Sequence, residues 1–288
     1  MSGRITFWYG CNVLRHGDII HICVDILGRL GFDVRLAGGP DYCCGNGKDA
    51  NLTAADGMAN RTVTKFNNFQ RDQVVAWCPS CHTHMTDFMG QAYKTGFSLD
   101  HLVNVLYEHR DALSAFLKHS VPMRVLLHKH MGFNGKVEVN AKVPVLLRLI
   151  PGIEVIEDGY AAPGYQCLML ATVLPAMEDM VARTLRLADR HHADAVVTVF
   201  HQCHRALCGL EGEVGTKVFN YVHLLAQSMG LNYPDEYKEW KKSGPRARTL
   251  IGEPRIAKVG VQFFERAVLP ELVKRTVGLS PKSKDRNK

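Results

Sequence analysis

One pattern of residues occurs twice in this sequence, at an offset of 122 or 123 positions. The aligned segments are Tyr9 to Asn12 with Met131 to Asn134, Cys43-Cys44 with Gln166-Cys167, Trp77 to His82 with Val199 to His204, and His101-Leu102 with His223-Leu224. Four matches at nearly one offset indicate an internal duplication. We therefore predict two tandem units, over residues 1–120 and 121–231, followed by a helical extension and tail over residues 232–288.

Short apolar segments alternate with amphipathic segments in both units. The first unit has strand-like segments at 5–9, 32–36 and 73–77, with helical periodicity at 17–30 and 52–69. The second unit has strand-like segments at 124–127, 153–156 and 195–199, with helical segments at 143–149, 175–190 and 221–229. Strands that alternate with helices form parallel sheets covered on both faces. The sequence therefore predicts an α/β fold of two Rossmann-like units with parallel sheets, plus a C-terminal helical extension.

The cysteine content points to metal binding or catalysis. The chain of 288 residues has nine cysteines, and no apolar run approaches the roughly 18 residues that span a bilayer. The N-terminal residues lack the basic start and long apolar stretch of a signal peptide. We therefore expect a cytoplasmic protein without a membrane span. Disulfides rarely persist in the cytoplasm, so the cysteines are more suited to metal binding or catalysis.

The mildly basic charge is not a signal for nucleic-acid binding. The formal net charge is +7, and part of it comes from a C-terminal tail with Lys282, Lys284, Arg286 and Lys288. Such tails are usually solvated. Since no basic stripe interleaved with aromatic residues is present, we expect no nucleic-acid partner.

Five cysteines of the first unit follow the ends of three predicted strands. Cys11 follows the first strand, Cys43 and Cys44 follow the second, and Cys78 and Cys81 follow the third. Because the carboxyl ends of parallel strands share one sheet edge, these thiols are expected to converge. Several thiolates that arrive from different directions are what an iron–sulfur cluster requires.

Other roles for these cysteines remain open at this point. Cys78 and Cys81 could form a thioredoxin-like redox pair, but this leaves the other three unexplained. A tetrahedral zinc site is possible, although the tandem Cys43-Cys44 suits it poorly. Buried structural thiols would not gather at three strand ends; Cys23, by contrast, lies on the apolar face of a helix and is predicted to be a core residue. The C-x-x-C-x-x-C run of ferredoxins is absent, which argues against a conventional cubane cluster.

The spacing C-x31-CC-x33-C-x-x-C, with Gly45 after the cysteine pair, resembles the CCG (cysteine-rich) domain found in the B-type subunit of heterodisulfide reductase. The resemblance covers about residues 4–230, so the two units correspond to two CCG repeats. In that family each complete motif holds a non-cubane [4Fe-4S] cluster through five cysteines. The resemblance thus implies that Cys11, Cys43, Cys44, Cys78 and Cys81 bind one such cluster, a cofactor and metal site in the first repeat.

The second repeat departs from this motif. Phe133, Gln166 and Phe200 stand at three of the cysteine positions, and only Cys167 and Cys203 remain. Phenylalanine cannot bind iron, so we expect no cluster there and expect the two rings to fill the vacated space. A replacement metal site is an alternative, with the two cysteines and ligands drawn from His128, His130, Met131, His201 and His204.

The two remaining thiols have two possible uses. Cys167 and Cys203 are expected to lie near each other, either as a redox-active dithiol or as inert residues. Cys208 has no assigned role.

The resemblance implies an iron–sulfur subunit of a heterodisulfide reductase-like complex, an oxidoreductase subunit that carries one cluster per chain. It would transfer electrons and perform thiol/disulfide or sulfur-carrier redox chemistry, as in the related complexes of sulfur oxidisers. The alternative is a non-catalytic electron-relay or assembly subunit. The resemblance also implies a ferredoxin-type iron–sulfur subunit and a flavin subunit as partners. Residues 45–48 lack the spacing of a phosphate-binding loop, so any flavin would be bound by a partner.

Overall fold

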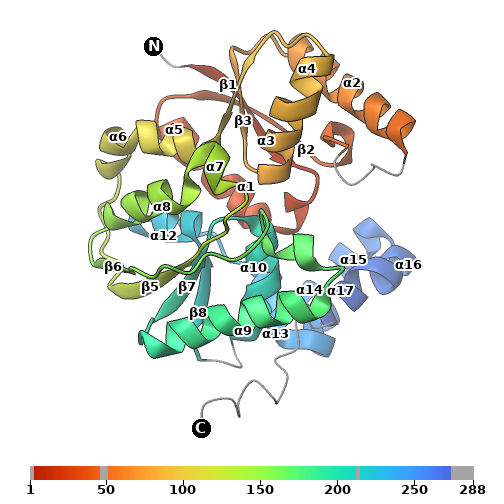
Figure 1. Ribbon diagram of the computed structural model, residues 1–288. Helices are drawn as coiled ribbons and strands as arrows, with labels where there is room; N and C mark the ends of the chain where they lie inside the picture. The colour runs from red at the N-terminus through yellow and green to blue at the C-terminus, as the bar shows by residue number, and fades with distance from the viewer. Residues whose placement is uncertain (1–2, 46–50, 212–214, 274–288) are drawn as a thin grey trace.

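Two parallel four-stranded sheets form the framework of the protein (Figure 1). The computed structural model describes residues 3–45, 51–211 and 215–273, so the predicted basic tail lies outside the described residues. The first sheet has the order β2-β1-β3-β4 and the second has the order β6-β5-β7-β8. The strands are β1 (Arg4–Gly10), β2 (Asp33–Gly38), β3 (Gln73–Ala76) and β4 (Ser98–His101), then β5 (Met123–His128), β6 (Ile153–Ile156), β7 (Ala195–Thr198) and β8 (Lys217–Asn220). The shared strand order and the parallel pairing confirm the predicted α/β fold of two tandem units.

Helices cover these sheets and continue beyond the second one. The helices of the first unit are α1 (Gly17–Arg29), α2 (Leu52–Asn68), α3 (Pro79–His84), α4 (Gly90–Ala92), α5 (Leu102–Glu108) and α6 (Arg110–Ser114). Those of the second unit are α7 (Asn134–Val137), α8 (Val139–Arg148), α9 (Leu174–Arg190), α10 (His201–Leu207) and α12 (Tyr221–Ser228). The C-terminal extension is helical, as predicted, with α13 (Glu236–Ser243), α14 (Ala247–Ile251), α15 (Glu253–Val259), α16 (Val261–Phe263) and α17 (Leu269–Val273).

The fourth strand of each sheet is not evident in the sequence. Sequence periodicity indicates three strands per unit, whereas β4 and β8 each add a four-residue strand at one edge of a sheet. Their sequences, Ser-Leu-Asp-His and Lys-Val-Phe-Asn, are short and at least half polar. Such segments pair with β3 and β7 because tertiary contacts hold them there, not because of their own pattern.

Helix α1 has the predicted apolar face, and Cys23 lies on it. The Cys23 side chain is fully buried among Ile19, Ile22 and Ile26 of the same face, and burial raises the pKa of its thiol well above the usual value. This environment is that of a packed core residue.

Cys23→Ala is expected to lower the free energy of unfolding by about 1 kcal/mol, because it removes one buried sulfur from the core. Denaturant unfolding measures this loss. The iron content of the same variant should equal that of the unsubstituted protein, and a fall in iron would contradict the assignment of Cys23 to the core.

Helices at the centre of the molecule join the two units. Helix α1 packs on α12 and α5 packs on α8, and one hydrophobic core extends through both units. The stacked rings of Trp77 and Tyr221, with centroids 5.9 Å apart, belong to this junction. The Trp77 Nε1–H donates to Nδ1 of His201 at 3.2 Å. The first unit, which carries the five cysteines, therefore packs directly against the second.

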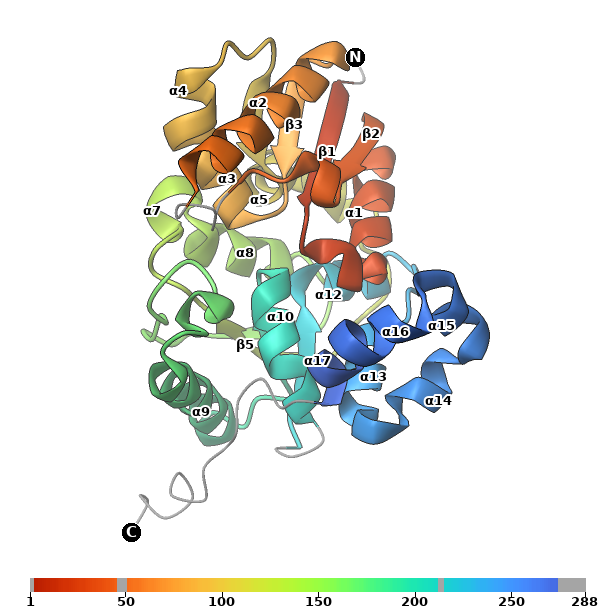
Figure 2. The same ribbon diagram turned by 90° about the vertical axis from the view of Figure 1, so that its right-hand side faces the viewer.

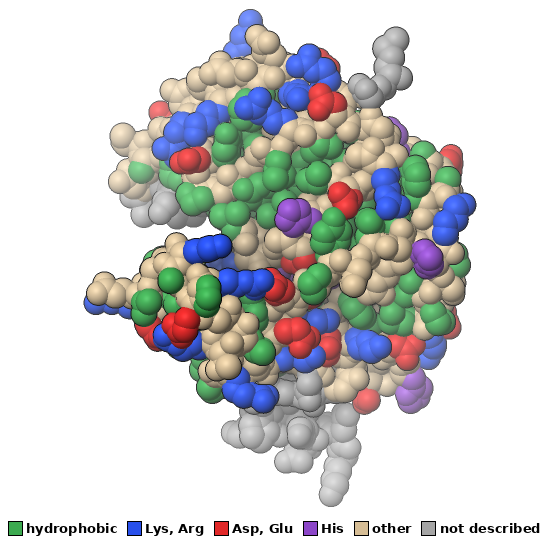
Figure 3. Space-filling view, turned by 180° about the vertical axis from the view of Figure 1, so that it is seen from behind, with side chains coloured by type: hydrophobic (Ala, Val, Ile, Leu, Met, Phe, Trp, Pro, Cys, Tyr) green, Lys and Arg blue, Asp and Glu red, His purple; other side chains and the backbone are tan. Residues whose placement is uncertain are grey.

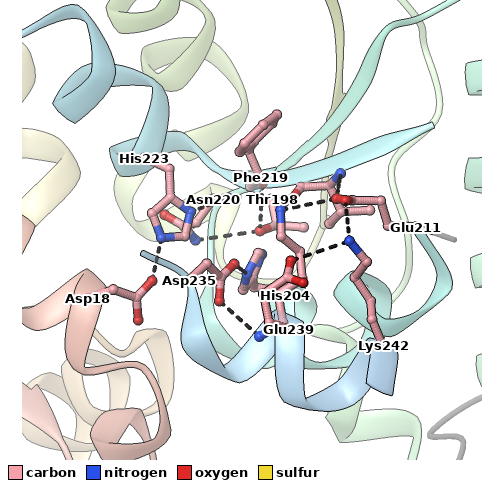
Figure 4. Close-up of polar contacts among 12 residues, drawn as sticks. Asp18, Thr198, His204, Glu211, Phe219, Asn220, His223, Asp235, Glu239 and Lys242 are labelled. Atoms are coloured by element: carbon pink, nitrogen blue, oxygen red, sulfur yellow. Dashed lines mark hydrogen bonds and ion pairs between the residues drawn. The ribbon is translucent and has the colours of Figure 1, made fainter. Parts of the chain in front are cut away.

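The C-terminal helices pack beside α10 (Figure 2) and are tied to the second unit by a buried polar contact and to the first unit by a partly exposed ion pair. His204 Nε2 lies 2.6 Å from an Asp235 carboxylate oxygen, and His223 Nε2 lies 2.6 Å from Asp18 (Figure 4). Burial raises the pKa of Asp235, but the contacts with His204 and the nearby His223 outweigh burial and hold that pKa well below its usual range. Arg15 in turn pairs with Glu271 at 2.8 Å, which joins the start of the chain to α17.

Among the described residues, no helix is long and apolar enough to cross a membrane. The face seen from behind carries Lys and Arg interspersed with Asp and Glu, without a continuous basic stripe (Figure 3).

Candidate metal centre

The five cysteines of the first unit lie at one edge of the first sheet. Cys11 follows β1 directly, and Cys43 and Cys44 follow β2 after a single helical turn at Pro40–Tyr42. Cys78 precedes the first residue of α3, and Cys81 lies within that helix. All three connections leave the carboxyl ends of parallel strands, which explains why residues far apart in sequence meet here.

The thiols contact one another in a connected set. A hydrogen bond joins Cys11 to Cys43, and Cys81 bonds to both Cys44 and Cys78. Electrostatic interactions of Cys11 with Cys44 and Cys78 connect the two groups. The bond to Cys43, together with burial, raises the pKa of Cys11; the bonds to Cys44 and Cys78 raise that of Cys81 well above its usual value. The structure thus brings together all five cysteines that the sequence singles out.

Cys78 is the sulfur most suited to the thiolate form. A hydrogen bond from Cys81 lowers the pKa of Cys78, and the backbone N–H groups of Ser80 and Cys81 lower it further, although burial opposes them. Backbone amides at the start of a helix stabilise negative charge on a nearby sulfur. The strand–helix junction therefore prepares this position for a thiolate.

Two glycines next to the cysteines have positive φ angles and no room for a side chain. Gly10 has φ +84°, and a Cβ atom there would lie 3.2 Å from Cys81 Sγ. Gly45 has φ +82°, and a Cβ atom there would lie 3.0 Å from the carbonyl oxygen of Ala55. The bare backbone at Gly10 and the donor set of five soft thiols fit an iron–sulfur group.

The site has a buried side and a more open side. Cys44, Cys78 and Cys81 are 3%, 7% and 2% exposed, whereas Cys11 and Cys43 are partly exposed. A groove between α2 and the α3–α4 segment passes near this site, and Ala55, whose carbonyl oxygen faces Gly45, lies in its wall. Among the five cysteines, Cys11 and Cys43 are therefore the more accessible to solvent.

In the second unit, aromatic rings occupy two of the former cysteine positions. Phe133 and Phe200 are buried, with ring centroids 5.7 Å apart at 76°, which confirms the expected approach of the two rings. Phe133 also contacts His82 and His101 of the first unit, with centroids 5.5 and 5.0 Å away. Gln166, at a third cysteine position, donates to Ser80 Oγ at 3.2 Å. These residues pack the two units together.

Phe133→Ala is expected to destabilise the fold by about 3–5 kcal/mol, because the ring is fully buried between the two units and its removal leaves a cavity. Thermal or denaturant unfolding measures the loss. Phe133→Leu, which fills much of the same volume, is the matched control and should cost far less; equal losses in the two variants would contradict a packing role.

The remaining thiols of the second unit lie in a compact group with two histidines. One donor atom from each of His128, His130, Cys167 and Cys203 lies within 4.8 Å of the other three, and all four residues are buried. The backbone N–H of Cys167 donates to Cys203 Sγ at 3.5 Å. The expected proximity of the two thiols is therefore confirmed.

The other candidate ligands of the second unit lie elsewhere. His201 contacts Trp77, His204 contacts Asp235, and Met131 is 60% exposed. Cys208 is buried apart from this group, and burial raises the pKa of its thiol. The sequence suggests several candidate histidines but does not select the pair. The structure selects His128, the last residue of β5, and His130, two positions after it.

The two thiols of this group differ in acidity. Burial and the hydrogen bond to Cys203 raise the pKa of Cys167 well above its usual value. Burial also raises the pKa of Cys203, but the hydrogen bond with Cys167 and the interactions with His130 and His128 outweigh it and bring that pKa well below its usual range. The buried group thus favours a negative charge on one sulfur.

Comparison with known solved structures shows only distant likeness. A candidate Asp/Glu racemase from Yersinia pestis is 12% identical, with a TM-score of 0.37, over 79% of this chain and 97% of that one. Maleate cis-trans isomerase from Nocardia farcinica is 15% identical, with a TM-score of 0.32, over 80% of this chain and 94% of that one. No significant match was found among curated proteins.

Comparison with protein families gives a match in the first unit. Residues 5–86 match the cysteine-rich domain CCG, and this segment includes β1, β2, β3 and all five cysteines of the connected set. The match agrees with the resemblance seen in the spacing of the cysteines. Residues 5–86 are therefore similar to the cysteine-rich domain CCG, and this segment is called the CCG domain below.

Proposed function

We propose that this protein is the iron–sulfur subunit of a heterodisulfide reductase-like complex, with one non-cubane [4Fe-4S] cluster held by Cys11, Cys43, Cys44, Cys78 and Cys81. The observation that carries the proposal is the contact set of five thiols at one sheet edge, inside the segment that matches the CCG domain. Proteins use such thiolate sets to bind iron–sulfur clusters.

The chain's own residues give the site its asymmetry. When bound, the cluster would supply one-electron transfer. The buried Cys44, Cys78 and Cys81 exclude water from one side. The partly exposed Cys11 and Cys43 form the side that a thiol, a disulfide or a sulfur carrier could approach.

The partners proposed are a ferredoxin-type iron–sulfur subunit and a flavin subunit, with a cytoplasmic location. The second unit supports a count of one cluster per chain, because Phe133 and Phe200 replace two of the five cysteines and their packed rings close the corresponding space. A chain with one cluster could not split a disulfide between two clusters.

The second candidate function is a non-catalytic relay or assembly subunit. The burial of three of the five cysteines favours it, since electrons can reach a cluster that substrates cannot contact. The two functions predict different responses of the cluster to thiols.

Iron and acid-labile sulfide in anaerobically purified protein test the cofactor, with about four irons per chain expected for this cluster type. Stoichiometric zinc without labile sulfide in the CCG domain would refute the proposal. The EPR spectrum of the oxidised cluster, recorded with and without added thiols or disulfides, separates the two roles: a changed spectrum supports redox chemistry on sulfur substrates, and an unchanged spectrum supports the relay.

A further inference from the structure

We propose that the second unit holds a separate, closed metal site, in which His128, His130, Cys167 and Cys203 bind one tetrahedral zinc ion. The site is independent of the five-cysteine site in the CCG domain. Two of its ligands, Cys167 and Cys203, stand at positions that align with cysteines of the first unit. The other three aligned positions of the second unit have no cysteine. Its role is to stabilise the fold.

The spacing of the four donor atoms fits a single ion. His128 Nε2 lies 3.1 Å from His130 Nε2 and 3.1 Å from Cys167 Sγ. His130 Nε2 lies 3.6 Å from Cys167 Sγ and 3.3 Å from Cys203 Sγ. Around tetrahedral zinc, with bonds of about 2.0–2.1 Å to nitrogen and about 2.3 Å to sulfur, the nitrogens lie about 3.3 Å apart and each nitrogen lies about 3.6 Å from a sulfur.

Hydrogen bonds on the far side of each imidazole fix its tautomer. His130 Nδ1 lies 3.0 Å from the carbonyl oxygen of Pro163, which can only accept, so this nitrogen carries a proton. His128 Nδ1 lies 3.0 Å from Thr184 Oγ1, whose own proton is donated to the Met180 carbonyl oxygen. His128 Nδ1 is therefore also the donor. Both Nε2 atoms consequently present lone pairs to the group of four, in the orientation that second-shell partners impose on metal-binding histidines.

When both imidazoles are neutral with the proton on Nδ1, two lone pairs face each other across the group, and a positive centre between them would satisfy both. The Nε2 atoms are 3.1 Å apart, and in this tautomer neither has a proton to share with the other. The thiols could donate to the imidazoles, but S–H is a weak donor and leaves the two nitrogens in opposition. A divalent cation satisfies both nitrogens and both sulfurs at once.

Charge and burial favour a closed site. None of the four side chains is more than 2% exposed. Two thiolates and one divalent cation sum to zero charge, so the loaded site avoids the cost of an unpaired charge in the interior. A site with four protein ligands and no open position is typical of structural zinc.

The ligands come from three separate segments that the backbone holds in place. His128 ends β5 and His130 follows it, Cys167 begins the helical turn Cys167–Leu170, and Cys203 lies on α10. Backbone hydrogen bonds of 2.8 and 2.9 Å join Lys129 and Met131 to Ala162, so the loop that contains His130 is pinned on both sides. An ion here would cross-link all three segments.

In sheet register, His128 occupies the place of Trp8. Trp8 pairs with Ala76 of β3, and His128 pairs with Thr198 of β7. Cys11 lies three positions after Trp8, whereas Phe133 lies five positions after His128, and His130 lies in this longer connection. Neither histidine thus has a metal-binding counterpart in the first unit, because Trp8 stands in the place of His128 and the shorter connection has no residue in the place of His130. This difference agrees with a different metal in each unit.

The close nitrogen–sulfur distances favour one ion over a two-iron cluster. A cluster bound by two histidines and two cysteines places the nitrogens on one iron and the sulfurs on the other. Here each nitrogen lies 3.1–3.6 Å from a sulfur, so all four atoms can surround the same ion. A tetrahedral set of two sulfurs and two nitrogens selects zinc.

The test measures zinc, iron and labile sulfide in the full chain and in paired variants. We expect about one zinc per chain in the unsubstituted protein and at least a tenfold loss of zinc in His130→Ala and in Cys203→Ala, while iron in the CCG domain is retained. His201→Ala and Cys208→Ala remove a buried histidine and a buried cysteine from the same segment and are the matched controls; both should keep their zinc. Cys81→Ala should lose iron and keep zinc.

Cobalt provides a second readout on the unsubstituted protein, in case a variant fails to fold. Co²⁺ added to metal-depleted, refolded chain should give the intense visible bands of a tetrahedral ion and the near-ultraviolet thiolate charge-transfer bands, and Zn²⁺ should abolish both. Absence of zinc together with no tetrahedral cobalt spectrum would overturn the proposal. Equal zinc in His130→Ala, Cys203→Ala and their controls would overturn it as well. So would labile sulfide that remains in Cys81→Ala and is lost when His130→Ala is added, because the second unit would then hold an iron–sulfur cluster.

Discussion

Cys81→Ala is expected to reduce the iron of the protein from about four atoms per chain to less than about one. Cys81 Sγ contacts both Cys44 and Cys78, and its side chain is only 2% exposed. It therefore links a sulfur after β2 to one after β3. Iron analysis and visible absorbance of anaerobically purified protein measure the loss.

Cys23→Ala is the matched control for this experiment, since Cys23 is equally buried but packs in the core of α1. It should keep full iron and full visible absorbance. Retention of four irons by Cys81→Ala would show that Cys81 is not a ligand, and the five-cysteine site would then need to be abandoned.

Removal of the metal from the second unit is expected to lower its free energy of unfolding by at least about 4 kcal/mol, the linkage value for a ligand present at roughly a thousand times its dissociation constant. The physical reason is that the ion would cross-link β5, the turn Cys167–Leu170 and α10. In a chain of this size such a loss corresponds to a fall in Tm of roughly 8–16 °C.

Calorimetry with and without a zinc chelator measures this change. The Cys167→Ser, Cys203→Ser double variant is the control: its Tm should be low from the outset and should not respond to the chelator. A chelator response of the same size in the double variant would place the effect at another site. An unchanged Tm in the unsubstituted protein, at a chelator concentration that removes its zinc, would show that the ion does not stabilise the fold.

Part of this fold could be predicted because it depends on local pattern. The alternation of apolar and amphipathic segments indicates parallel sheets, and the repeated segments around Cys11, Cys44 and Cys78 indicate two units of one topology. The edge strands β4 and β8 could not be predicted, because four residues that are at least half polar carry no periodic signal and become strands only by pairing with β3 and β7.

The convergence of the five cysteines also follows from the sequence, since a parallel sheet brings the carboxyl ends of β1, β2 and β3 to one edge whatever the details of the loops. The sequence likewise shows that Phe133 and Phe200 stand where cysteines stand in the first unit. Strand order and residue type are enough to make both statements.

Only the tertiary structure decided which histidines accompany Cys167 and Cys203. His128, His130, His201 and His204 are all close to a strand end in sequence, yet the first two face the thiols and the other two face Trp77 and Asp235. The choice depends on which way each ring is turned. Hydrogen bonds to Thr184 and Pro163, far away in sequence, fix that orientation, and no local pattern of residues encodes them.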